Sequence, residues 1–211
     1  MNRFTCVKTA VFAALLLSIS TMLAQSPQPF AADFSAVSAV SKDRPPLTGR
    51  LFSSLPNTRM DMTTRGMATS MIVNGNTKTS YIVMHAQHMY MEMKPGQANP
   101  MGQSLPQVES SFDPKNPCAA STDSTCKDLG PDTVNGRLCE KWQITPKNGN
   151  VTTTWVDQKI HFPIKTQTAD GSSFELSNIK EGSQPASLFD PPADYRKMDL
   201  GGMMGGGRPP Q

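Results

Sequence analysis

Short alternating segments separated by turn signals restrict this chain to β structure. Apolar and polar residues alternate with a period of two in stretches such as 57–65 and 67–76, as in a β-strand with one buried face. The Asn-Gly pair at 74–75 and the Asp-Gly pair at 170–171 favour the tight turns of β-hairpins. No segment keeps a helical period over three turns. The expected strands cover 32–42, 46–54, 57–65, 67–76, 79–85, 88–94, 136–147, 150–158, 162–169 and 172–180.

The first 24 residues have the pattern of a secretory signal peptide. Arg3 and Lys8 supply a positive start, an apolar run follows at 11–17, and the stretch 20–24 leads to a cleavage position after Ala24. The apolar run is too short to span a membrane. We therefore expect an exported protein located in the periplasm. The expected organisation is a signal peptide at 1–24, a linker at 25–32, a β domain at 33–198 with an irregular insertion at 95–130, and a flexible Gly/Met/Pro tail at 199–211.

The expected mature chain is almost neutral. Of the 20 Lys and Arg residues, Arg3 and Lys8 leave with the signal peptide, so 18 remain against 17 Asp and Glu residues. Because no cluster of basic residues remains to neutralise a row of phosphates, we expect no nucleic-acid partner. The sequence also lacks the motifs of nucleotide-binding loops and activated nucleophiles, so we expect neither a cofactor nor catalysis.

Three cysteines follow the expected cleavage position, and export would bring them into an oxidising compartment. Cys118 and Cys126 flank a small polar loop, whereas Cys139 lies in the alternating stretch 136–147. We favour a Cys118–Cys126 disulfide, which would staple a connection with little core of its own, over a bridge that uses Cys139. The cysteines form no Cys-x-x-Cys pair and have no histidine nearby, so a zinc site is not indicated.

The order of several stretches carries a family resemblance. They are 30–40, 49–62 and 73–82 near the start of the domain, and 159–166 and 172–198 near its end, the last with Phe-x-Pro-Pro. In this order they resemble the periplasmic lipoprotein carriers of the LolA type and their less characterised relatives. The resemblance extends over about 33–198, apart from the insertion, and is closer to the uncharacterised relatives than to the carrier itself.

The resemblance implies an open half-barrel of LolA type, a curved antiparallel sheet whose apolar concave face takes acyl chains. In the carriers, helices cover that face and an arginine precedes a Pro-Asn turn. Here Leu55 precedes the Pro-Asn pair, and the chain has no clear amphipathic lid helix. The resemblance therefore implies the scaffold rather than the carrier's handling cycle.

Methionines recur at the positions of one strand face. In the stretch 88–94, Met89, Met91 and Met93 share one face, while His88 lies on the other. The same alternation in the preceding strands adds further methionines to this apolar face. The candidate ligand-binding residues are Met60, Met62, Met71, Met84, Met89, Met91 and Met93.

Three interpretations of these methionines stay open. They can fill an irregular core, they can form a surface that adapts to varied apolar ligands, or their thioethers can join imidazole in a Cu(I) site. The copper site would use His88, Met89, Met91 and Met93, although His88 points away from them on a flat strand. We predict a non-catalytic periplasmic binding protein that holds a lipid acyl chain or another apolar ligand on its methionine-lined concave sheet, with a lipid or lipoprotein acyl chain as the expected partner. The alternative is a periplasmic Cu(I)-binding protein.

Overall fold

The described residues form one continuous β-sheet. The structure is a computed structural model and describes residues 26–41, 45–64, 66–93, 115–119, 123–147 and 149–198. Its strands are β1 (Phe30–Val37), β2 (Leu47–Ser54), β3 (Asn57–Thr64), β4 (Met67–Asn74), β5 (Thr79–Met84), β6 (Met89–Met93), β7 (Ser124–Val134), β8 (Arg137–Pro146), β9 (Thr152–Asp157), β10 (Pro163–Thr168), β11 (Ser173–Glu181) and β12 (Arg196–Lys197). The helical segments in these ranges are short 3₁₀ turns, η1 (Ala39–Ser41), η2 (His85–Gln87) and η3 (Ala186–Phe189).

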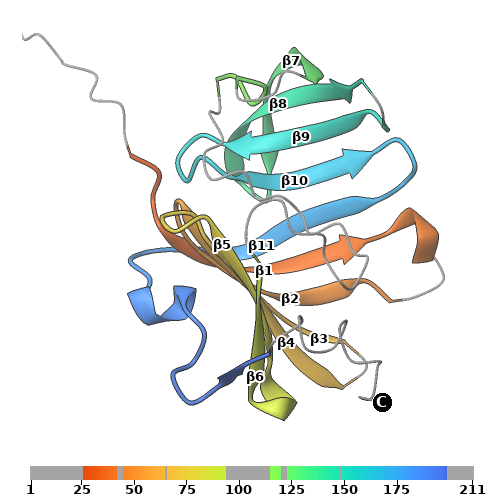
Figure 1. Ribbon diagram of the computed structural model, residues 1–211. Coiled ribbons are helices and arrows are strands. Elements are labelled where there is room, and N and C mark those ends of the chain that lie inside the picture. The colour runs from red at the N-terminus through yellow and green to blue at the C-terminus, as the bar shows by residue number, and fades with distance from the viewer. Residues whose placement is uncertain are drawn as a thin grey trace, which may run out of the picture.

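Strand β1 joins the two halves of the sheet. Hydrogen bonds connect the strands in the order β12-β6-β5-β4-β3-β2-β1-β11-β10-β9-β8-β7. Antiparallel pairing joins β1 to β2 on one side and to β11 on the other, whereas β12 pairs with β6 in parallel. Figure 1 shows β8–β11 in the upper half and β3–β6 running steeply away from them in the lower half. The expected all-β class with an open curved sheet is confirmed.

The main hydrophobic core lies where the two halves meet. Phe30 and Phe34 of β1 are buried and pack in one cluster with Leu51 of β2 and Leu176 of β11. The ring of Phe30 also contacts that of Phe162 at 5.3 Å between centroids. Each such side chain contributes about 1.5–3 kcal/mol when it leaves water, so alternate residues of β1 bind both halves together.

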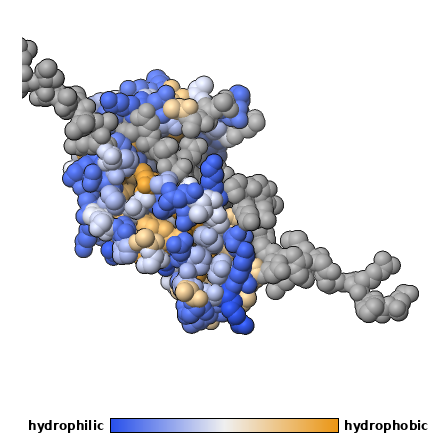
Figure 2. Space-filling view, turned by 60° about the vertical axis from the view of Figure 1, so that its left-hand side comes forward, coloured by the Kyte–Doolittle hydropathy of each residue, from blue (hydrophilic) through white to orange (hydrophobic). Residues whose placement is uncertain are grey.

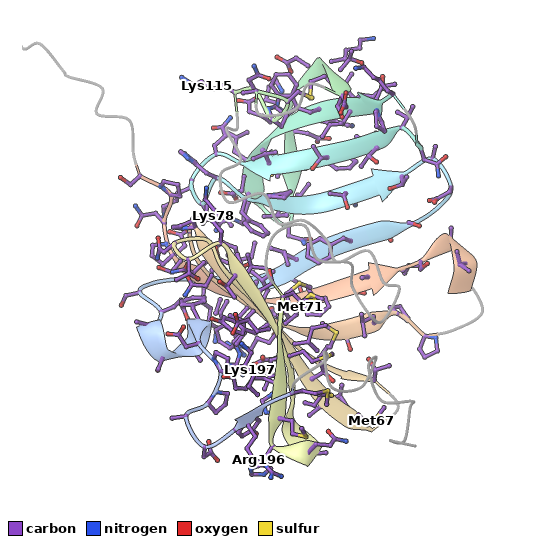
Figure 3. The ribbon with its side chains drawn as sticks, viewed as in Figure 1. Met67, Met71, Lys78, Lys115, Arg196 and Lys197 are labelled. Carbon is purple, nitrogen blue, oxygen red and sulfur yellow. A yellow bond between two sulfur atoms is a disulfide. The ribbon has the colours of Figure 1, made fainter. Side chains whose placement is uncertain are left out.

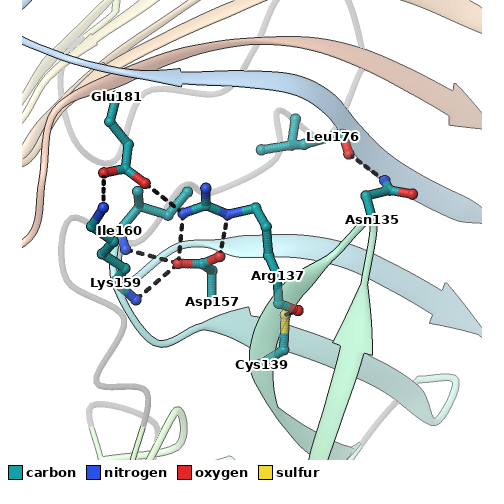
Figure 4. Close-up of polar contacts among 8 residues, drawn as sticks. All are labelled: Asn135, Arg137, Cys139, Asp157, Lys159, Ile160, Leu176 and Glu181. Atoms are coloured by element: carbon teal, nitrogen blue, oxygen red, sulfur yellow. Dashed lines mark hydrogen bonds and ion pairs between the residues drawn. The ribbon is translucent and has the colours of Figure 1, made fainter.

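Polar contacts fix the β7–β8 hairpin against β11, a strand with which it does not pair (Figure 4). Arg137 of β8 donates hydrogen bonds to Asp157 at the end of β9 and, at 3.0 Å, to Glu181 of β11. Asn135 in the hairpin turn donates to the backbone oxygen of Leu176 at 3.0 Å. These contacts curl the upper half of the sheet toward its own middle.

Two expected boundaries differ from the structure. β1 begins at Phe30, inside the expected linker 25–32, because the Phe30 ring is a fully buried part of the core. β7 begins at Ser124, so the end of the expected irregular insertion 95–130 is strand. This strand lies at the edge of the sheet with polar residues on both faces, which gives it the composition of a loop.

The predicted signal peptide at 1–24 and the tail at 199–211 lie outside the described residues. The same holds for most of the insertion, from 95 to 114 and from 120 to 122. Within the described ranges, no helix has the length and apolar character needed to cross a membrane.

Candidate ligand-binding face

The strand registers gather the predicted methionines on one face of β3–β6. Met60 of β3 lies opposite Met71 of β4, which lies opposite Ile82 of β5, which in turn lies opposite Met91 of β6. Directly opposed residues project from the same side of a sheet. These four residues therefore form an apolar row across four strands, and Leu51 of β2 extends it because Leu51 lies opposite Met60.

The other predicted methionines occupy neighbouring rows of the same face. Met62 lies opposite Thr69, Thr69 opposite Met84, and Met84 opposite Met89. Met93 lies opposite Ser80, two residues from Ile82 on β5 and hence on the same side. We call this side of β3–β6, with its seven methionines, the methionine face. Whether these residues bind a ligand stays a prediction.

The methionine face is buried at its centre and exposed at one end. Met60, Met91 and Met93 are buried, whereas the methionines of the Met62 row are only half-buried. Beyond that row, strand alternation places Met67 and Leu47 on the same face, where they are 53% and 36% exposed. We call these two residues the rim. The apolar surface thus extends from the core to solvent.

A C-terminal arm, residues 186–198, covers the opposite face of β3–β6. Phe189 and Leu188 of the arm pack with Ile72 of β4 and Val83 of β5, two strand residues that alternate with the methionines. Figure 3 shows Met71 projecting on the side away from this arm. Figure 2 views the molecule from the side of the arm, where hydrophilic residues predominate. The arm therefore covers one face of β3–β6, and the methionine face is the other.

A chain of hydrogen bonds attaches the arm to the sheet. The sequence contains no motif that would have predicted these bonds. Tyr195 of the arm lies 2.9 Å from His85 Nδ1, and His85 Nε2 lies 2.7 Å from Ser70 Oγ. Ser70 donates to Asp61 at 2.6 Å and accepts from Arg59 at 3.0 Å. Although a serine beside a histidine is the pattern of a nucleophile and its base, Ser70 is completely buried. The arrangement fits attachment of the arm rather than reaction with a substrate.

His88, the histidine of the copper alternative, lies with His85 on the side of the arm. η2 and the left-handed residue His88 turn the chain between β5 and β6, so that the rings of His85 and His88 both contact Tyr195. Met89 and Met91 project from the other face of β6. In the described part of the chain, no three His, Cys, Asp or Glu side chains converge to hold a metal ion. The imidazoles of His85 and His88 and the thioethers of Met89 and Met91 therefore project from opposite sides of the sheet.

A polar hollow of about 300 Å³ lies between β1, β2 and the end of β11. Its lining is mostly charged and polar: Asp33 lies 3.9 Å from Arg50 and accepts a hydrogen bond of 2.8 Å from Asn178. Such a lining does not favour an apolar ligand.

The cysteines follow the favoured pairing. Cys118 and Cys126 form a disulfide, and Cys126 belongs to β7. Cys139 is a free, buried thiol. Burial, with the neighbouring Asp157 carboxylate, raises the pKa of Cys139 to about 11, so the thiol stays protonated and poorly nucleophilic at neutral pH.

The central part of the chain shows to which family the protein belongs. Residues 50–161, which include β3–β6 and β7–β9, match the family described as a domain of unknown function, DUF4412. The chain belongs to this family. A comparison with curated proteins finds no match. Membership of DUF4412 agrees with the resemblance to uncharacterised LolA-like proteins seen in the sequence.

Several solved structures are similar to this DUF4412 protein. An uncharacterized conserved protein from Thermus thermophilus has a TM-score of 0.52 at 9% identity, with 81% of this chain and 90% of that chain covered. The MucA/MucB complex of Pseudomonas aeruginosa has a TM-score of 0.50 at 15% identity, covering 80% of this chain and 57% of that chain. The LolA superfamily protein NE2245 from Nitrosomonas europaea has a TM-score of 0.36 at 13% identity, covering 79% and 92%. At such identities the likeness concerns the fold.

Proposed function

We propose that this DUF4412 protein is a non-catalytic, exported binding protein that holds an acyl chain or another long apolar ligand on its methionine face. The observation that carries the proposal is the apolar row Leu51–Met60–Met71–Ile82–Met91, which crosses five strands and belongs to a face that ends in the exposed rim. A largely apolar surface that passes from core to solvent, with Thr69 and Thr64 as polar positions near the rim, offers an apolar molecule a path.

The opposite face supports this assignment. It has its own apolar cover in Phe189 and Leu188, and the polar side chains of Ser70 and His85 on it are hydrogen-bonded. A ligand would have to displace the arm to reach that side. The methionine face offers rows of unbranched, polarizable thioethers, which repack around ligands of varied shape at little cost.

A solved structure of similar fold is a protein complex. It is the MucA/MucB complex of Pseudomonas aeruginosa, and this chain covers 57% of the matched chain. For this chain, the signal-peptide pattern favours a periplasmic location. Recovery of the protein from the periplasm of its host with residues 1–24 removed is the test of that location.

Uptake of a fluorescent fatty acid tests the binding role. Protein that lacks residues 1–24 is titrated with cis-parinaric acid. Met71→Asp places a charge in the central row and should weaken binding by at least about tenfold, because the charge would lose its water beside the ligand. Met71→Leu keeps the row apolar and should bind the probe as the wild type does. Val40→Asp adds the same charge at a residue that is 97% exposed and should have no effect.

Folding of the variants is checked by circular dichroism and by the thermal midpoint. Met67→Asp changes the exposed rim, where a charge leaves the core intact, and should weaken uptake by a smaller factor than Met71→Asp. If the wild-type protein takes up no apolar probe, or if Met71→Asp binds it with wild-type affinity, the proposal is wrong. Substitution of leucine at Met89, Met91 and Met93 should spare uptake; loss of a tight Cu(I) site in that variant, together with no uptake by the wild type, would favour copper instead.

A further inference from the structure

The half-buried methionine row ends in an arginine. β12 runs parallel to β6, and Arg196 lies opposite Met89, the last methionine of the row that begins at Met62. Opposed residues share a face, and Met198, two residues further along the arm, packs in the same cluster as Met91 and Met84. Arg196 is therefore on the side of the methionine face, at the edge of the sheet.

The guanidinium of Arg196 has no ionic partner among the described residues, whereas the neighbouring side chains of Lys197 and His88 each lie beside a carboxylate. Lys197 projects to the other face and pairs with Glu92 at 2.5 Å, and His88 lies 3.7 Å from Asp194. Arg196 itself is exposed and joins the sheet through its backbone N–H, which donates to His88 at 2.9 Å. Figure 3 shows Arg196 at the lower end of β6, beside the turn from β5.

Arg196 lies at the end of the row that borders the exposed rim. The Met62–Thr69–Met84–Met89 row lies directly inside the rim, whereas the Met60 and Met93 rows lie deeper. Four strand spacings separate Met62 from Arg196, about 19 Å at 4.7–4.9 Å per spacing. An extended long-chain acyl group has a comparable length. A ligand along this row would rest its chain on thioethers and bring its terminal group to the guanidinium.

We infer that the ligand of the methionine face is an anionic amphiphile, an acyl chain that ends in a carboxylate or a phosphate and whose anionic group is bound by Arg196. The inference rests on the proposed function and names its ligand class. Arginine suits this role because it stays charged at all working pH values and donates two parallel hydrogen bonds to a carboxylate or phosphate.

The experiment compares ligands that share a chain and differ in headgroup. Palmitic acid, hexadecyl phosphate and hexadecanol compete with a fluorescent fatty acid for the protein without residues 1–24. The wild type should prefer both anions to the alcohol, and higher salt should reduce that preference. Arg196→Gln should weaken anion binding by about threefold to tenfold and leave hexadecanol unchanged, whereas Arg196→Lys should restore part of the preference. Binding of only one of the two anions identifies the headgroup.

Lys78→Gln is the matched control. Lys78 is an exposed cation in the β4–β5 turn, at the end of those strands away from the rim. Its replacement should change neither the affinity for the two anions nor the affinity for hexadecanol. If the wild type binds no probe, the proposed function itself fails. If it binds acid and alcohol equally, or if Arg196→Gln weakens all ligands alike, the apolar site stands and the headgroup inference is wrong. An equal loss in Lys78→Gln would also overturn it, since the attraction would then be unspecific.

Discussion

Arg137 holds the carboxylate of Asp157 in a two-pronged contact at the point where the upper half of the sheet closes on β11. Asp157 is 1% exposed, and Arg137 donates to both of its oxygens. Burial alone raises the pKa of Asp157, but the hydrogen bonds from Arg137 and from the backbone N–H groups of Ile160 and Lys159 outweigh it, so this pKa lies below its ordinary value of 3.8. The charged form is thus stabilised by folding.

Arg137→Leu should destabilise the protein by roughly 3–5 kcal/mol at neutral pH, because it leaves a buried carboxylate unpaired. In the wild type the folded-state pKa of Asp157 is lowered, so its contribution is present above the unfolded-state value and disappears as the pH falls through the folded-state value. In the variant only the backbone N–H groups of Ile160 and Lys159 still oppose the effect of burial, so the pKa of Asp157 is higher than in the wild type. The difference between the two free energies of unfolding should therefore shrink below about pH 4.

Urea unfolding of both proteins between pH 3 and pH 8 measures this difference. Arg50→Leu is the control, because Arg50 and Asp33 form a half-exposed pair at 3.9 Å, and its loss should cost less than about 1 kcal/mol. A cost for Arg137→Leu that equals the control, or that grows in acid, would contradict the assignment.

Two buried serines should respond in opposite ways to loss of the hydroxyl group. Ser53 is 1% exposed and its Oγ has no hydrogen-bond partner in the described structure, whereas Ser70 is fully buried and bonded to Asp61 and His85. Ser53→Ala should be neutral or stabilising by about 1 kcal/mol, and Ser70→Ala destabilising by about 1–3 kcal/mol. Chemical denaturation of the two variants side by side decides the matter. A larger cost at Ser53 than at Ser70 would show that Ser53 has a partner.

The Cys118–Cys126 disulfide should stabilise the protein through a short loop. Its two cysteines are separated by 8 positions in the sequence, and closing a loop of that size contributes about 2–3 kcal/mol. The double variant Cys118→Ser, Cys126→Ser should lose this amount relative to the oxidised wild type and match the reduced one. Treatment of the double variant with a reductant serves as the control and should not change its stability, since its remaining thiol, Cys139, is free. A variant as stable as the oxidised protein would contradict the expectation.

The C-terminal arm should depend on Phe189. This ring is buried against Ile72 and Val83, and Phe189→Ala should cost about 3–5 kcal/mol. Hydrogen exchange should quicken in β4–β6 and in the arm and stay slow in β8–β10, because the ring contacts only the lower half of the sheet. Tyr195→Phe removes the single hydrogen bond to His85 and should cost about 1 kcal/mol. Uniform acceleration across both halves in Phe189→Ala would instead indicate one cooperative unit.

The sequence by itself determined the features that depend on neighbours along the chain. Strand alternation is local, so the face of Met89 and Met91 follows from the positions of the residues alone. The hairpin turns between β3, β4 and β5 set a register without bulges, and for that reason Met60, Met71 and Met84 also reached the expected face. The disulfide was predictable because its loop is short and polar.

Only the tertiary structure decided which distant segments meet. The pairing of β1 with β11 and of β12 with β6 joins parts of the chain more than 100 residues apart, and no local pattern specifies such a partner. Tyr195 thereby reaches His85, and Arg196 comes to lie beside Met89. In the sequence these residues look like ordinary surface groups of separate segments. Strand pairing decides which residues they meet, and this pairing depends on burial of the two sheet faces together rather than on the neighbouring residues in the sequence.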